Sequence, residues 1–89
     1  MAVLVVPSSL RRYTDQRSRL TLPANTIQEV LELFAKGSSD LRNHLFSGAG
    51  LRKFVVVCKN GCDIRLLEGL STELDESDEV QIVASVAGG

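Results

Sequence analysis

Short apolar segments separated by polar loops organise this chain. Residues 2–6 are continuously apolar and rich in β-branched side chains, which predicts a strand buried on much of both faces. Residues 17–22 alternate polar and apolar positions, which predicts a half-buried strand. Pro7 and the polar residues 8–15 predict a loop between them, so we expect the two strands to pair antiparallel.

Residues 26–36 carry the clearest helical signal. Thr26 and Glu29 have the spacing of a capping box, in which the hydroxyl accepts from the Glu29 amide and the carboxylate reaches back. Apolar residues then recur at helical spacing: Ile27, Val30, Leu31 and Phe34. Gly37 directly after Lys36 predicts a glycine cap at the C-terminal end of this helix, following a last turn that carries a basic residue.

The second half of the chain predicts a hairpin and a last strand. Residues 54–58 have strand composition, and residues 79–83 predict the final strand. Asn60-Gly61 indicates a two-residue hairpin turn, because both central residues of a type I′ turn need positive φ. Residues 62–65 then form a short return strand.

The remaining segments predict short helical turns and loops. Leu41, Leu45 and Phe46 favour a helical turn that covers one end of the core, with a loop over residues 47–50. Residues 71–74 predict a second helical turn.

The order strand, strand, helix, strand, short strand, strand predicts an α+β fold. A single amphipathic helix must pack across one sheet, and the two most apolar strands, the first and the last, are expected side by side at its centre. This arrangement is the ubiquitin-like β-grasp, with a mixed sheet of four to five strands. We expect residues 1–83 to form that domain and residues 84–89 to form a flexible tail ending in Gly-Gly.

Composition fits a small soluble protein. The 89 residues include 44% apolar and 24% charged residues, which suits one modest core. A net charge of −1 gives no support to a nucleic-acid partner. No run reaches the roughly 18 apolar residues of a membrane span, and no secretory signal is recognisable, so a cytoplasmic protein without membrane contact is expected.

Charged residues are unevenly spread along the chain. Arginines cluster early, namely Arg11, Arg12, Arg17 and Arg19. Acidic residues cluster late, namely Glu68, Glu73, Asp75, Glu76, Asp78 and Glu79. The two clusters are either solvated loop regions or a surface that steers partners, with the acidic end beside the C-terminus.

Catalytic and metal-binding patterns are weak, so we do not expect an enzyme. His44 is the only histidine, and it lacks a nucleophile partner and metal-ligand spacing. The hairpin register places Cys58 opposite Asp63 and Lys59 opposite Cys62. Because successive side chains of a strand point to opposite faces, Cys58 and Cys62 would lie on opposite faces of the sheet, which argues against a disulfide between them.

A single helix covers only one face of the sheet, so apolar residues on the other face should be exposed. Val55 and Val57 are expected in the core, with Val57 opposite Ile64. One register of residues 2–6 and four further residues are expected on the open face: Phe54, Val56, Cys58 and Val83. Such a patch usually marks a partner site, although a loop near Gly50 or a dimer would also cover it.

The chain ends in Gly88-Gly89, a pair that occurs by chance in roughly one chain in 200. Glycine lacks Cβ, so the backbone can approach a partner's active site closely. We expect the Gly89 carboxylate to be the reactive group and Gly88 to provide clearance. Val86 and Ala87 are expected to contact the partner that receives the tail.

Three parts of the chain resemble the ThiS/MoaD family of prokaryotic ubiquitin-like sulfur carriers. These are the diglycine end after the strand 79–83, the hairpin 54–65 and the segment 67–74. The N-terminal Val-Pro-Ser-Ser-Leu-Arg is similar as well, so the resemblance covers nearly the whole chain. Carriers that feed cysteine biosynthesis look most similar, followed by the small subunit of molybdopterin synthase. Ser85, where proline is common, and Lys59, where an apolar residue is common, depart from the pattern.

The resemblance implies a carrier function. An E1-like enzyme adenylates the Gly89 carboxylate with ATP, and a sulfurtransferase or other sulfur donor converts it to a thiocarboxylate. A downstream synthase then accepts the sulfur for cysteine, molybdopterin, thiamine or a secondary metabolite. The chain itself holds no cofactor, since the partner uses the ATP. Two alternatives remain: a ubiquitin-like modifier joined to lysines, and a binding module that uses only its apolar face.

Overall fold

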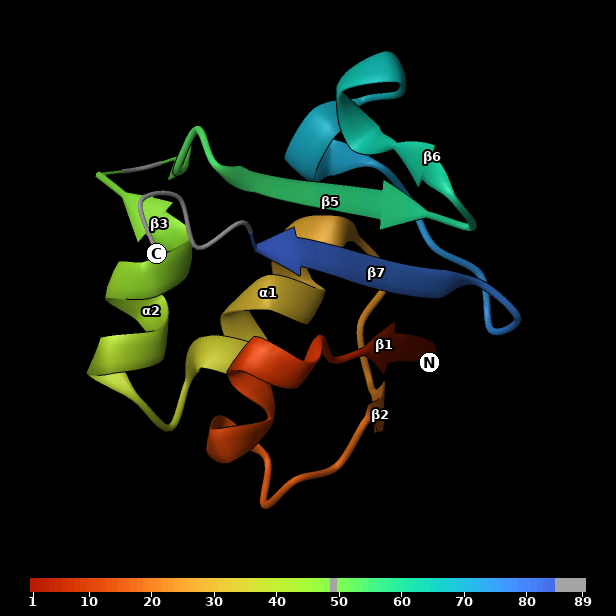
Figure 1. Ribbon diagram of the computed structural model, residues 1–89. Helices are drawn as coiled ribbons and strands as arrows, with labels where there is room; N and C mark the ends of the chain where they lie inside the picture. The colour runs from red at the N-terminus through yellow and green to blue at the C-terminus, as the bar shows by residue number, and fades with distance from the viewer. Residues whose placement is uncertain (49, 85–89) are drawn as a thin grey trace.

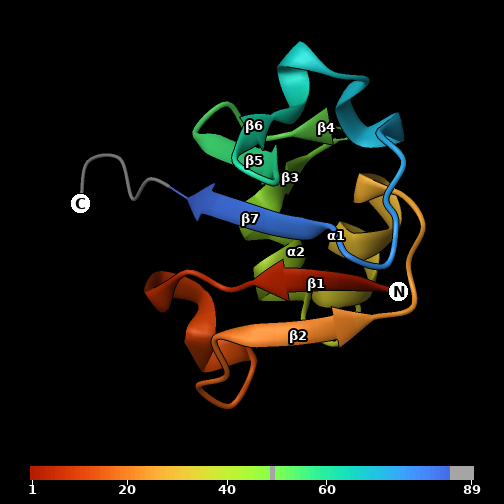
Figure 2. The same cartoon turned by 90° about the vertical axis from the view of Figure 1, so that its right-hand side faces the viewer.

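Five strands of the computed structural model form one mixed sheet in the order β2-β1-β7-β5-β6, which confirms the β-grasp prediction (Figures 1 and 2). The structure describes residues 1–48 and 50–84. The sheet strands are β1 (Ala2–Val5), β2 (Arg19–Leu22), β5 (Val55–Lys59), β6 (Cys62–Asp63) and β7 (Glu79–Ala84). The helices are α1 (Ile27–Ala35) and α2 (Ser39–Leu45), with 3₁₀ turns η1 (Ser8–Tyr13), η2 (Ile64–Leu66) and η3 (Gly69–Ser71).

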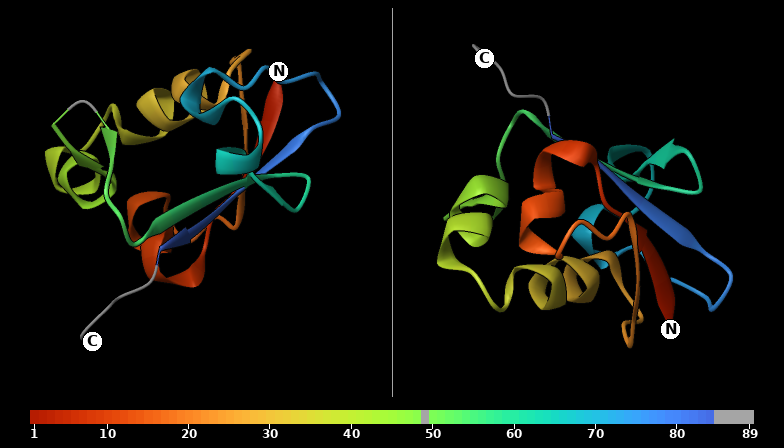
Figure 3. Two further views of the ribbon diagram at one scale, coloured as in Figure 1. Left: turned by 90° about the horizontal axis from the view of Figure 1, so that it is seen from above. Right: turned by 60° about the horizontal axis from the view of Figure 1, so that its bottom comes forward.

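The first and last strands lie side by side at the centre, as predicted. β1 pairs in parallel with β7, with Leu4 opposite Val80, and pairs antiparallel with β2 on its other side. Leu4 and Val80 are both completely buried, which explains why the most apolar strands take this position. From above, α1 and α2 lie on the same side of β5 and β7 (Figure 3).

The start of α1 follows the predicted capping signal with one difference. The Glu29 amide donates to Thr26 Oγ1 at 3.2 Å, while Glu29 Oε1 accepts from the Asn25 amide at 2.8 Å, one residue before the cap. The predicted glycine cap is wrong, because Gly37 does not adopt positive φ. The chain instead passes directly into the N-cap of α2, where Ser38 Oγ accepts from the Leu41 amide.

Several short elements differ from the sequence expectation. The predicted loop after β1 is the 3₁₀ helix η1, which buries Leu10 completely. Ser47 and Gly50, predicted to lie in a loop, pair with one another in a small ladder of β3 (Phe46–Ser47) and β4 (Gly50–Leu51). The helical turn expected at 71–74 lies earlier, as η3. Each of these elements packs against the core through at least one apolar residue. Such contacts with distant residues cannot be read from the local sequence.

α2 covers one end of the core, as predicted. Leu41 and Leu45 are buried, and Phe46 packs against the core cluster. Within the described ranges 1–48 and 50–84, no helix has the length and apolarity needed to cross a bilayer.

A polar cluster around Asp78 fixes the start of β7 to the hairpin tip. Asn60 and Gly61 adopt φ of 51° and 84°, which confirms the two-residue turn. Asp78 accepts from Asn60 Nδ2 at 2.8 Å and from the Asp75 amide at 2.7 Å. Lys59 lies 3.6 Å from the Asp78 carboxylate and donates to the Glu73 carbonyl at 2.9 Å. Lys59, which stands where the ThiS/MoaD pattern commonly has an apolar residue, therefore contributes a charge and a hydrogen bond to this cluster.

Replacing Asp78 with alanine should destabilise the fold by about 2 kcal/mol, because it removes two part-buried hydrogen bonds to a charged carboxylate. The Asp75 amide and the Asn60 side chain, aided by the Lys59 charge, hold the pKa of Asp78 below its ordinary value. The Asp78 carboxylate therefore stabilises the fold at pH values above the pKa that it has in the unfolded chain. This stabilisation is lost as the pH falls below about 4. Urea unfolding of the wild type and Asp78→Ala across pH should show the two curves converging in acid.

The matched control is Glu76→Ala, at an exposed neighbour in the same turn. It should change the unfolding free energy by less than about 0.5 kcal/mol. Equal losses for both variants would contradict the role given to Asp78.

Candidate functional site

β7 carries the chain towards its C-terminus through the middle of the sheet. It is hydrogen-bonded to β1 on one side and to β5 on the other, with Ala84 opposite Val55. The predicted functional residues Val86, Ala87, Gly88 and Gly89 lie outside the described residues, as does Ser85. The structure therefore places the strand that precedes the diglycine and not the diglycine itself.

The open face of the sheet carries an apolar strip close to the end of β7. Val56 and Val83 are direct partners in the antiparallel ladder, and Val83 is 55% exposed. Val3 and Val5 alternate with the fully buried residues of β1 and lie half-buried on this same face. We call these four residues the outer-face valines. Figure 2 views this face, with both helices behind the sheet.

Phe54 does not belong to this strip, so its predicted placement beside Val56 is wrong. It precedes β5 in a tight turn, in which the Val55 amide donates to the Arg52 carbonyl at 3.0 Å. Strand alternation does not extend into that turn. Phe54 is half-buried and packs against the core, and the centroid of its ring lies 5.9 Å from that of the His44 ring. Val55 and Val57 are buried as expected, although Ile64 joins the core from η2 rather than from a strand.

Several charged side chains of the two clusters have structural partners. Arg11 Nε donates to the Val6 carbonyl at 3.2 Å, and Arg19 pairs with Glu79 at 2.7 Å across the open face. On the hairpin, the Arg65 guanidinium beside Asp63 holds the pKa of that carboxyl below its usual value. The Arg19–Glu79 pair joins the early basic cluster to the late acidic one.

No catalytic centre forms among the described residues. His44 lies in the last turn of α2, and its Nε2 has no hydrogen-bond partner in the part of the chain that the structure describes. Cys58 and Cys62 are free thiols in the predicted pairing. No group of three potential metal ligands occurs within residues 1–48 and 50–84.

Comparison with known proteins gives a consistent result. The ThiS family model matches residues 4–89. A putative sulfur carrier protein of Archaeoglobus fulgidus is 37% identical over 65 residues, which cover 72% of this chain and 74% of that protein. Small archaeal modifier protein 3 of Haloferax volcanii is 33% identical over 64 residues, covering 72% of this chain and 70% of that protein.

The fold is similar to a solved structure over its whole length. The crystal structure of the Amycolatopsis orientalis BexX/CysO complex contains a chain that matches with a TM-score of 0.87 and 25% identity, covering 100% of both chains. The match to the family model includes every strand of the sheet except the start of β1. This chain belongs to the ThiS family.

Proposed function

We propose that this chain is a sulfur carrier whose Gly89 carboxylate is adenylated by an E1-like enzyme and then converted to a thiocarboxylate. One observation carries the proposal: the family match runs to residue 89 and so includes the terminal Gly-Gly pair.

The chemistry proceeds in three steps. A carboxylate oxygen of Gly89 attacks the α-phosphate of ATP, which forms an acyl adenylate and releases pyrophosphate. The terminal sulfur of a donor persulfide then attacks the activated carbonyl, and AMP leaves with the bonding electrons. A thiolate of a partner attacks the donor sulfur of the resulting acyl disulfide, which forms a disulfide with the donor and releases the thiocarboxylate. Activation divides one difficult substitution into two easier ones. The partner enzyme supplies ATP and its metal, and this chain supplies the carboxylate.

The sheet provides a rigid base for the chain end. Because β7 is held on both sides, the partner would meet a chain that leaves a fixed point. The five residues that follow it would span roughly 17 Å if extended in a partner's channel. Gly88 and Gly89 bring no Cβ to that channel, and Val86 and Ala87 would contact its walls.

The outer-face valines would hold the activating enzyme or the sulfur-accepting synthase. Val83 is one residue from the end of β7, and Val56 is its direct neighbour. A partner that covers these two residues would therefore receive the chain end next to its docking surface. The BexX/CysO complex is consistent with a chain of this fold assembling with a partner protein.

Incubation with a cognate E1-like enzyme, ATP and a sulfur donor should raise the intact mass by the difference between sulfur and oxygen. Omission of ATP should abolish the gain, because the carboxylate is inert until it is adenylated. Intact-mass spectrometry provides the measurement.

Deletion of Gly89 is the matched variant for this experiment. The truncated chain should melt like the wild type and gain no mass. Thiocarboxylate formation in the truncated chain would show that the Gly89 carboxylate is not the reactive group.

Val83→Asp should weaken activation by the E1-like enzyme about tenfold or more, because it places an unpaired charge in the docking surface. The cost to stability should be small, since Val83 is largely exposed. The control is Leu66→Asp, which makes the same change at a residue that is 80% exposed in η2. Initial rates of pyrophosphate release give the comparison, and equal rates for the two variants would argue against this surface.

A second function uses the same carboxylate. The similarity to a small archaeal modifier protein favours conjugation of Gly89 to lysines of target proteins. Isopeptide-linked Gly-Gly remnants, sought by peptide mass spectrometry in cells expressing a tagged chain, would identify it. Their absence, together with thiocarboxylate formation, would leave the carrier function alone.

A further inference from the structure

Among residues 1–48 and 50–84, β2 is the outermost strand on its side of the sheet, and no other strand of these ranges lies along its outer edge (Figure 2). The Val6 amide donates to the Ser18 carbonyl at 2.8 Å, which sets the hydrogen-bonding alternation of the β1–β2 ladder. Leu20 therefore directs its backbone groups towards β1, whereas Arg19 and Thr21 direct theirs outwards. Both outward residues are exposed.

A hollow of about 240 Å³ lies beside this edge, on the helix side of the sheet, with a lining that is more polar than apolar. Side chains from η1, β2 and α1 line it, including Tyr13, Leu20, Leu22, Leu33 and Phe34. The hollow is smaller than the pockets that hold drug-sized ligands. It has room for one aliphatic side chain from a segment that lies along β2.

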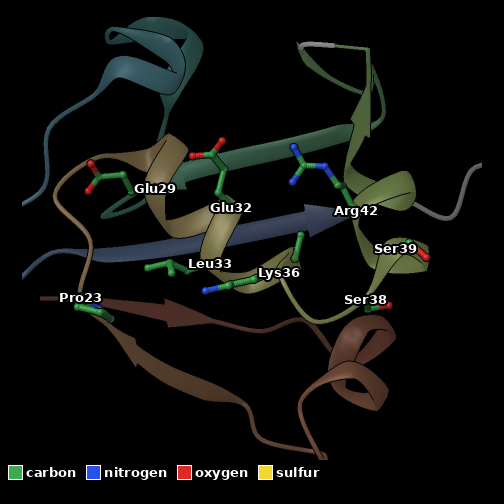
Figure 4. Close-up of a pocket in the computed structure, with 9 residues that line it drawn as sticks. Pro23, Glu29, Glu32, Leu33, Lys36, Ser38, Ser39 and Arg42 are labelled. Carbon is green, nitrogen blue, oxygen red and sulfur yellow. The ribbon is translucent and has the colours of Figure 1, made fainter.

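Leu33 also lines a second, more open groove of about 710 Å³ that continues along α1 towards α2 (Figure 4). In Figure 4, Leu33 and Lys36 extend from the same side of α1, and Pro23 marks the end of β2 nearby. The two hollows share Leu33, and the second is lined by the carboxylates of Glu29 and Glu32 as well as by Lys36 and Arg42.

Two guanidinium groups and one carboxylate lie in or beside the lining of the hollow. Arg17 lines it, and the Arg12 guanidinium lies 4.9 Å from the ring centroid of Tyr13, another lining residue. Asp15 is the one acidic residue among those that line the hollow. This balance of charge therefore favours a ligand that carries carboxylates.

The loop that carries Arg17 has a defined conformation. Asp15 and Gln16 both adopt positive φ, at 52° and 67°. The Gln16 amide donates to the Arg11 carbonyl at 2.8 Å, and Thr14 Oγ1 donates to the Arg17 carbonyl at 2.8 Å. These bonds place Arg17 beside the hollow.

We propose that the β2 edge binds an extended, acidic segment of a partner protein as an additional strand. The outward N–H and C=O groups of Arg19 and Thr21 pair with the segment's backbone. One aliphatic side chain of the segment fills the hollow, and its carboxylates face Arg12 and Arg17. Main-chain pairing gives such complexes affinity, and the pocket for an alternate side chain gives specificity.

This surface is separate from the proposed docking strip around Val83. β1 lies between β2 and β7, and the segment would add on the side of β2 that faces away from both. One partner could therefore hold the β2 edge while another acts on the chain end. The inference does not depend on the chemistry of Gly89.

The test uses the full chain and a blocked synthetic peptide in which Val alternates with Glu. Fluorescence anisotropy should show binding that weakens with salt, and the matching peptide of Val and Lys should bind about tenfold more weakly or not at all. Hydrogen exchange should slow at the Arg19 and Thr21 amides on binding. The Leu20 amide, already paired with β1, serves as an internal control.

Thr21→Pro removes one outward N–H without removing a bond to β1, and proline is tolerated at such an edge position. It should weaken binding about tenfold, whereas Thr21→Val, which keeps the amide, should bind within about twofold of the wild type. The double variant Arg12→Glu and Arg17→Glu leaves β2 unchanged and should lose binding as well. Melting curves confirm that each variant folds.

Several results would overturn the proposal. They are no binding at millimolar peptide, equal binding of the Val-Lys peptide, protection at amides other than Arg19 and Thr21, and wild-type affinity in a folded Thr21→Pro. Sedimentation that shows the free chain paired through this edge would assign it to a second copy of this chain instead.

Discussion

The parallel pairing of β1 with β7 is the constraint on which the rest of the structure depends. It joins the two ends of the described chain at the centre of the sheet, so every other element must arrange itself around that pair. β2 and β5 add to its two sides, and α1 covers one face. Because this contact is so distant in sequence, the core cannot close until almost the whole chain is present.

The same pair separates the two faces of the sheet. Leu4, Val80 and Ile82 point into the core, whereas Val3, Val5 and Val83 point outwards, since side chains alternate along both strands. A strand that must be buried on one face and recognised on the other has little freedom in its register. The Asp78 cluster acts on that register directly, because it attaches the start of β7 to the hairpin turn at Asn60.

Local signals in the sequence predicted the parts that local interactions control. Thr26 and Glu29 marked the start of α1, and Asn60-Gly61 gave the hairpin with the correct register. Phe54 was misplaced because a turn, which strand alternation does not describe, precedes β5. The 3₁₀ helix η1 and the β3–β4 ladder depend on burying Leu10 and on packing Phe46 and Leu51 against the core. The free edge of β2 became visible only with the strand order, whereas the diglycine could be seen in the sequence alone.

The position of β7 also has a mechanical consequence. A partner that pulls on the chain end loads β7 along its length, against hydrogen bonds to neighbours on both sides. These bonds lie across the direction of pull, so they resist together in shear rather than opening one at a time. An enzyme that drew the end of this chain into a narrow tunnel would therefore leave the shape of the domain behind it unchanged.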